Sequence, residues 1–151
     1  MNFNTNTMKT LKEVRKFLSG INNINSGGCG IAALAMIRWI RKNLNKEITN
    51  IYFIHTFLNP YLEENRRYIN ERKGVICAPS HVYISFGGKI FDVFEYELKK
   101  YMYNTMQFKS EEILINSINN IGTWNRFFDR KESIPVIEAY LDISLSDIVV
   151  E

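Results

Sequence analysis

The sequence NSGGCGIAALAM, residues 25–36, joins a polar, glycine-rich loop to a strongly apolar segment. The glycines allow the backbone to turn, and residues 31–37 are too apolar to lie anywhere but in the core. The apolar pattern predicts a helix from about Cys29 to Leu44, buried on all sides at first and amphipathic after Arg38. This stretch therefore places Cys29 at the N-terminus of a buried helix.

A thiol in that position has particular chemistry. The unpaired backbone N–H groups of the first turn and the helix dipole both stabilise negative charge, so the thiolate of Cys29 is favoured there. The same N–H groups are suitable donors to an oxyanion that forms when sulfur attacks a carbonyl. Cys29 is therefore a candidate nucleophile, and a nucleophile of this kind needs a nearby base.

The composition predicts one folded domain, residues 1–151, in which residues 1–7 form a flexible tail. The 19 basic and 16 acidic residues give a net charge of +3, which is too small to indicate a nucleic-acid partner. Two cysteines do not make a disulfide framework, and free thiols are expected. With no apolar signal core and no membrane-length segment, we expect a soluble protein, cytoplasmic or packaged within a phage particle.

A β-hairpin is the clearest element after the helix. Ser80 to Phe86 alternates as a strand, Gly87-Gly88 is a two-residue turn, and Lys89 to Phe94 returns. In this register Tyr83 pairs with Asp92 and His81 pairs with Phe94. His81 and Asp92 are then diagonal neighbours on one face of the hairpin. A carboxylate there accepts from one ring nitrogen and leaves the other for the thiol.

The rest of the chain predicts smaller elements that complete an α+β fold, in which the Cys29 helix packs on a small antiparallel sheet. In the first half of the chain they are a helix over Met8–Leu18 ended by Gly20, a strand or irregular segment around Ile51–Ile54, and a helix over Pro60–Arg72. In the second half they are a strand or irregular segment over Tyr96–Phe108, a helix over Glu111–Asn120 with Ser110 as N-cap and Gly122 as C-cap, a short helix from Thr123, a helix over Ser133–Leu141 with Pro135 in its first turn, and a strand or docked tail over Ile143–Val150.

Each site residue also has an ordinary structural interpretation. Cys29 could be a small buried apolar residue, His81 a surface or capping residue, and Asp92 a cap at a strand end. Cys29, His55, Cys77 and His81 could nominally hold zinc, but their spacing lacks the short paired-ligand pattern, so no metal site is expected. The order Cys, His, Asp on these elements favours a catalytic triad.

The sequences GGCG at 27–30 and HVYISFGGKIFD at 81–92 resemble the papain-like cysteine peptidase and transglutaminase-like superfamily, including small phage and bacterial proteins. The resemblance implies a papain-like fold with Cys29 as nucleophile, His81 as general base and acid, and Asp92 as the residue that orients His81. It also implies that a polar side chain before the cysteine helps to form the oxyanion hole. Asn23 or Asn25 would have that role, although papain itself uses glutamine.

The expected function is a cysteine-dependent hydrolase or acyltransferase that acts on an amide or peptide bond without a metal or organic cofactor. The partners expected are a peptide or amide substrate, with no nucleic acid and no membrane. The alternative is an inactive papain-like binding or structural protein, for example a virion component. In that case an aromatic surface would meet the partner, formed by Tyr96, Tyr101, Tyr103, Trp124, Phe127 and Phe128.

Overall fold

The computed structural model describes residues 10–25, 27–57, 77–93, 105–119 and 128–150. These ranges form an α+β fold in which helix α2 packs against a small antiparallel sheet, as the sequence predicts. The helices are α1 (Leu11–Ser19), α2 (Cys29–Leu44), α4 (Glu111–Ile118) and α5 (Arg130–Leu141). The strands are β1 (Ile51–Phe57), β2 (Cys77–Phe86), β3 (Lys89–Phe91) and β4 (Thr105–Phe108).

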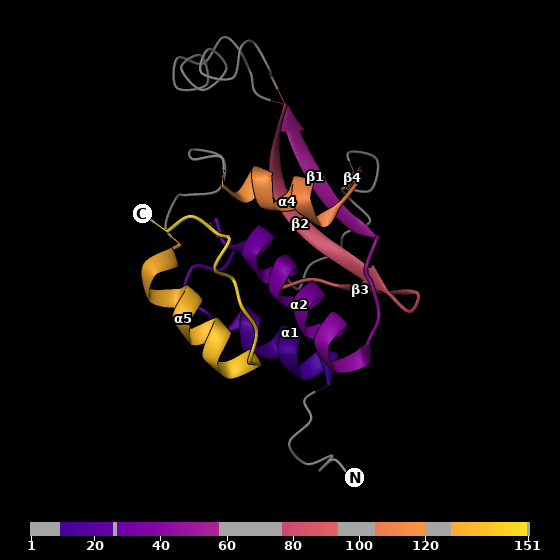
Figure 1. The fold of residues 1–151 in the computed structure, drawn as a ribbon. Helices are drawn as coiled ribbons and strands as arrows, with labels where there is room; N and C mark the ends of the chain where they lie inside the picture. The colour runs from indigo at the N-terminus through magenta and orange to yellow at the C-terminus, as the bar shows by residue number, and fades with distance from the viewer. Residues whose placement is uncertain (1–9, 26, 58–76, 94–104, 120–127, 151) are drawn as a thin grey trace.

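Helix α2 lies at the centre of the molecule, with the sheet on one side and α5 on the other (Figure 1). It contacts β2 and the three other helices in the described ranges, and every residue from Cys29 to Ile37 is buried. The predicted bounds are confirmed. Gly28 is the N-cap, and Asn45 ends the helix in the left-handed conformation, with φ of 52°.

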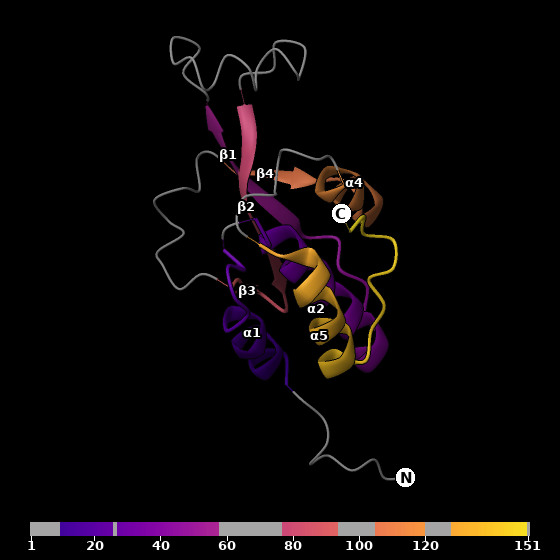
Figure 2. The same cartoon turned by 90° about the vertical axis from the view of Figure 1, so that its left-hand side faces the viewer.

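The sheet has the strand order β3-β2-β1-β4, so β2 and β1 are its central strands. Of the two alternatives predicted around residues 51–54, the strand is the correct one, and it extends to Phe57. Each pairing in the sheet is antiparallel. A view turned by 90° shows α2 between the long strands and α5 (Figure 2).

The Gly87-Gly88 turn is confirmed, since both glycines have positive φ, 60° and 77°. The predicted register holds for three pairs, which end at Ile84 opposite Phe91. The prediction that the ladder continues to residue 94 is wrong, because β3 ends at Phe91 and Asp92 lies beyond it. Beyond Phe91 the chain leaves the ladder, and the side chain of Arg15 donates to the backbone carbonyl of Asp92.

Helix α1 begins later than predicted. Thr10 and Glu13 form a capping box that starts the helix at Leu11, and Gly20 caps its end as expected. Its apolar face is confirmed, with Leu11, Val14 and Leu18 buried against the core. The capping box explains the difference. The Thr10 side chain accepts from the Glu13 N–H and the Glu13 side chain accepts from the Thr10 N–H, so the helix begins directly after Thr10.

Two further helix ends differ from prediction. Ser110 is the N-cap of α4, as expected, but the helix ends at Ile118 with Asn119 as C-cap, not at Gly122. Helix α5 begins at Arg130 because Asp129 accepts a hydrogen bond from the Glu132 N–H, at 3.1 Å. Pro135 therefore lies in the second turn of α5, not in the first.

The C-terminal segment docks on the core without forming a strand in its described part. Leu145 and Ile148 are buried, at 1% and 4% exposure. Arg130 anchors the segment by donating to the carbonyl of Val149 at 2.9 Å. Of the two predicted alternatives for this segment, the docked tail is the correct one.

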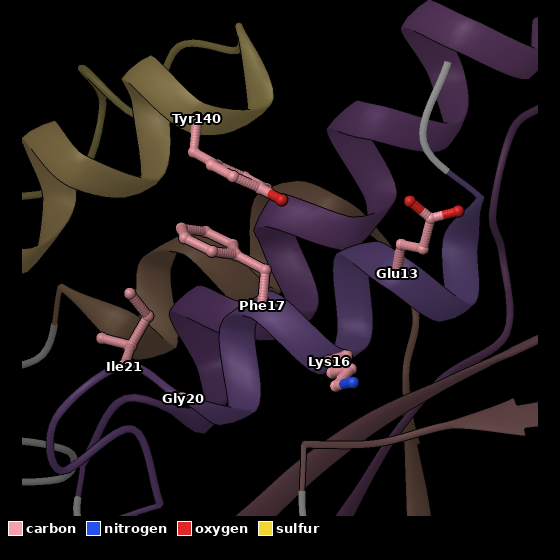
Figure 3. Close-up of a pocket in the computed structure, with 6 residues that line it drawn as sticks. All are labelled: Glu13, Lys16, Phe17, Gly20, Ile21 and Tyr140. Carbon is pink, nitrogen blue, oxygen red and sulfur yellow. The ribbon is translucent and has the colours of Figure 1, made fainter. Parts of the chain in front are cut away.

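A surface hollow lies between α1 and α5, lined by Glu13, Lys16, Phe17, Gly20, Ile21 and Tyr140 (Figure 3). Within it the rings of Phe17 and Tyr140 stack with centroids 3.8 Å apart. This contact joins α1 to α5 at the surface of the core.

Several predictions concern residues outside the described ranges. They are the tail at 1–7, the helix over Pro60–Arg72, the segment from Tyr96 to residue 104 and the short helix from Thr123 up to Phe127. Among the helices that the structure describes, none is long and apolar enough to cross a membrane.

The packing at the start of α2 leaves no room for a side chain at Gly28. A Cβ at this position would lie 2.7 Å from a ring carbon of Phe128 and 2.9 Å from the Ile24 carbonyl oxygen. We expect Gly28→Ala to lower the free energy of unfolding by about 1–3 kcal/mol, because the backbone oxygen cannot move away cheaply. Urea denaturation monitored by circular dichroism measures the change.

Gly20→Ala is the matched control. Gly20 also lies at a helix end with negative φ, −87°, and its added Cβ would meet its nearest atom at 3.4 Å. We expect its unfolding free energy to stay within about 0.5 kcal/mol of wild type. Equal effects of the two substitutions would contradict a packing requirement at Gly28.

Candidate active site

Cys29 is the first residue of α2 and is 2% exposed. No acidic residue lies in the first turn, and Gly28 provides no side-chain cap. The N–H groups of that turn have no preceding helical carbonyl to bond, so their partial positive charge faces the loop end where the thiol lies. The local field therefore favours negative charge near Cys29.

His81 lies on the central strand β2, opposite Ile54 of β1. The next pair toward the start of β2 joins His55 to Pro79, so Ser80 is an extra residue that forms a bulge beside His81. Bulges turn a strand locally and re-aim the side chains next to them. His81 is 5% exposed, so the strand holds the imidazole inside the protein.

Asp92 follows the end of β3 and is 4% exposed. Its Oδ1 lies 2.5 Å from Nε2 of His81, a hydrogen bond within the protein interior. The predicted side-chain pairing of His81 and Asp92 is thus present, although Asp92 reaches His81 from beyond the strand ladder. The carboxylate orients the imidazole ring.

Cys29 completes the cluster, because its side chain is close enough to His81 to influence the pKa of the imidazole. Burial lowers the pKa of His81, but hydrogen bonds and charge interactions with Asp92 and Cys29 outweigh burial and raise that pKa to about 9. The imidazole is therefore protonated at neutral pH. Since Nε2 bonds Asp92, Nδ1 is the ring nitrogen left for the sulfur.

This arrangement can hold an imidazolium between a carboxylate and a sulfur. In a region with so little exposure, charge interactions are stronger than in water. A thiolate beside an imidazolium is the reactive form of a cysteine nucleophile, and the same imidazolium can deliver a proton to a leaving group.

Asn23 and Asn25, the two residues predicted for the oxyanion hole, lie in the loop before α2, and both are exposed. Asn23 has a left-handed backbone, with φ of 60°. The side-chain amide of Asn25 donates to the carbonyl of Val93, 3.4 Å away. Asn25 thus contacts the residue next to Asp92, and its oxyanion role stays a prediction.

The described residues contain no group of three metal-ligating side chains that could hold an ion. The side chains of His55 and Cys77 lie outside the described residues, so the nominal zinc set cannot be assembled from the structure. Cys29 is a free cysteine.

Sequence reasoning missed Arg15, whose Nε donates to the backbone carbonyl of Asp92 at 2.6 Å. The helical pattern assigns the basic residues of α1 to the solvent face, yet Arg15 is half-buried. A signal was present, because Arg15 follows Val14 and lies three residues before Leu18, at the edge of the apolar face.

Comparison with protein-family models, with curated protein sequences and with solved structures found no match to this chain. Any functional interpretation therefore depends on the geometry of Cys29, His81 and Asp92.

The environment of His81 makes a prediction about its titration. Because its folded-state pKa is raised from 6.5 to about 9, its charged contacts stabilise the fold fully below pH 6.5, and this stabilisation is lost as the pH rises through about 9. We expect NMR of the imidazole protons to show this titration, and Asp92→Asn to lower the pKa of His81 by about one pH unit or more.

The chain has two histidines, so His55→Gln assigns the signals. Asp142→Asn is the matched control, since Asp142 is exposed and pairs with Lys42. An unchanged His81 titration in Asp92→Asn would contradict the pairing.

Proposed function

We propose that this protein is a thiol hydrolase or acyltransferase of papain-like type, acting on an amide or peptide bond through Cys29, His81 and Asp92. One observation carries the proposal: three residues from α2, β2 and the end of β3 meet in one buried cluster. They meet in the chemical order that nucleophilic catalysis requires, from thiol to imidazole to carboxylate.

In the proposed first step, the Cys29 thiolate attacks the substrate carbonyl carbon and the carbon–oxygen π electrons move to oxygen. Backbone N–H groups at the start of α2 stabilise the oxyanion, and Asn23 or Asn25 is the proposed side-chain donor. The tetrahedral intermediate collapses and the bond to the leaving amine breaks. The His81 imidazolium gives its proton to that amine, which leaves a thioester on Cys29 and a neutral imidazole.

In the second step, neutral His81 removes a proton from a water molecule or from an acceptor amine. The oxygen or nitrogen attacks the thioester, and collapse of the second intermediate expels the Cys29 thiolate. His81 is again protonated, so the imidazolium and thiolate are restored. Attack by water is hydrolysis and attack by an amine is acyl transfer, and the same residues serve both reactions.

Asp92 has a positioning role in this scheme. Its Oδ1 holds Nε2 of His81 at 2.5 Å and stabilises the charged ring between the two steps. No metal or organic cofactor enters either step. The proposed substrate is a peptide or another amide.

The alternative is a binding or structural protein on the same scaffold, with an aromatic surface for a partner. Of the aromatic residues predicted for it, Phe128 is described, and it is 6% exposed and packs on Gly28. The other members lie outside the described residues, and the phage setting stays a prediction. An unreactive Cys29 would favour this alternative.

Alkylation of Cys29 tests the proposed ion pair. A Cys77→Ser background leaves one thiol, and a small reagent such as iodoacetamide suits a sulfur that is 2% exposed. We expect the rate at pH 6, followed by intact mass, to exceed that of the urea-unfolded chain, because the charged imidazole of His81 lies beside the sulfur.

His81→Gln should remove this excess rate, because the imidazole that activates the sulfur is then absent. If Cys29 reacts only above pH 8 and His81→Gln changes nothing, the proposed dyad is wrong. The protein should then be treated as a binding or structural protein.

Acyl transfer to Cys29 tests the chemistry itself. We expect p-nitrophenyl acetate to release nitrophenolate and leave one acetyl group on Cys29, detected by peptide mass spectrometry. Cys29→Ala should lose this adduct completely while keeping the wild-type circular dichroism spectrum. Lys12→Ala, at an exposed position on α1, is the folded control that should keep the adduct. Acetylation of other residues with none on Cys29 would contradict a nucleophilic role.

A further inference from the structure

Asp92 lies where the sheet no longer determines the backbone. The last pair between β2 and β3 joins Ile84 to Phe91, so the ladder does not fix the following residue. Its carboxylate must nevertheless stay 2.5 Å from Nε2 of His81. His81 itself is held on a central strand, and the position of Asp92 needs another support.

That support comes from α1. Nε of Arg15 donates to the backbone carbonyl of Asp92 at 2.6 Å, across 77 positions of sequence. A charged donor makes a stronger hydrogen bond than a neutral one. The bond acts on the backbone of the residue whose side chain orients His81, so moving this carbonyl also moves the carboxylate.

The backbone of α1 at Arg15 is held in a fixed position relative to Cys29. Val14 and Leu18, its neighbours on α1, are both 0% exposed in the core that α1 shares with α2. Helix α2 carries Cys29. Through Arg15, Asp92 is therefore connected to α1, which packs on the helix that carries Cys29.

A second, weaker contact acts on the same segment. The amide of Asn25 donates to the carbonyl of Val93 at 3.4 Å, so consecutive carbonyls are held by α1 and by the loop that leads into Cys29. Both anchors come from the N-terminal part of the chain. Both act on the two residues that follow β3.

We propose that Arg15 is a positioning residue that holds the carboxylate of Asp92 on His81 by bonding the Asp92 backbone carbonyl. This inference rests on the proposed function, because it assigns Arg15 a part in the same Cys29–His81–Asp92 site. Arg15 does not act as an acid, base or nucleophile. Its effect reaches the reaction through Asp92.

The titration of His81 in Arg15→Leu distinguishes a displacement of Asp92 from the simple loss of the Arg15 charge. Removing a nearby cation would by itself raise the pKa of a histidine, since a repulsive charge is lost. Displacement of Asp92 acts in the opposite direction and lowers that pKa. We expect NMR to show the His81 pKa about one pH unit or more below wild type in Arg15→Leu, with a matching loss of Cys29 alkylation at pH 6.

Arg15→Lys keeps a charged donor and should restore most of the wild-type titration. Lys12→Leu removes a charge from an exposed position one turn earlier on α1 and should change neither readout. If Arg15→Leu does not fold, Arg15→Gln replaces it, because a polar side chain suits a half-buried position, and the same decrease is expected.

A His81 pKa that is unchanged or raised in the folded variant would overturn the positioning role. Failure of both neutral variants to fold would also overturn it, because Arg15 would then serve stability alone. The His81 titration of the wild-type protein shows whether a negative result contradicts the proposed function or only the role of Arg15. A wild-type His81 that titrates near its ordinary pKa of 6.5 contradicts the proposed function, whereas a titration near 9 that Arg15→Leu leaves unchanged contradicts only this inference.

Discussion

The burial of the first half of α2 on every side is the constraint on which the rest of the structure depends. Residues 31–37 are each at most 1% exposed, with the sheet on one side and three other helices around the remainder. Three of these residues are alanines, which let the neighbouring elements approach closely. A helix enclosed in this way has a fixed axis, so the position of its first residue, Cys29, is fixed as well.

The two ends of α2 have opposite electrostatic surroundings. Its first turn holds no acidic side chain, whereas its second half carries basic residues that pair with the acidic side chains of other elements. Arg38 bonds Asp147 of the C-terminal segment at 2.5 Å, and Arg41 pairs with Glu111 at the start of α4. Such partly exposed pairs contribute little stability, but basic groups near the end of the helix suit its dipole. The end whose own first turn has no acidic side chain is the one that carries the thiol.

The cluster combines local and distant parts of the chain. His81 and Asp92 are 11 residues apart, and a tight hairpin is enough to bring them near each other. Cys29 belongs to a different layer, and it meets them because α2 packs on β2. The interactions with Asp92 and Cys29 explain the high pKa of His81, because they outweigh the effect of burial. Without a carboxylate and a thiol beside it, desolvation would lower that pKa.

Local sequence determined most of the elements that build the site. The bounds of α2 follow from the glycine loop and the apolar run, and the register of the hairpin follows from Gly87-Gly88. Both features depend on residues close together in sequence, so periodicity and turn chemistry suffice to predict them. The starts of α1 and α5 are also set by nearby residues, because the N-caps Thr10 and Asp129 each accept a hydrogen bond from a backbone N–H three residues later.

Only the tertiary structure decided how the site is completed. The bulge at Ser80 and the end of β3 at Phe91 appear only in the paired sheet, and the bond from Arg15 to Asp92 appears only once α1 has packed near β3. No local pattern encodes that bond, because the arginine lies 77 residues from Asp92 in sequence. The sequence thus specified the chemical groups, and long-range packing determined their alignment.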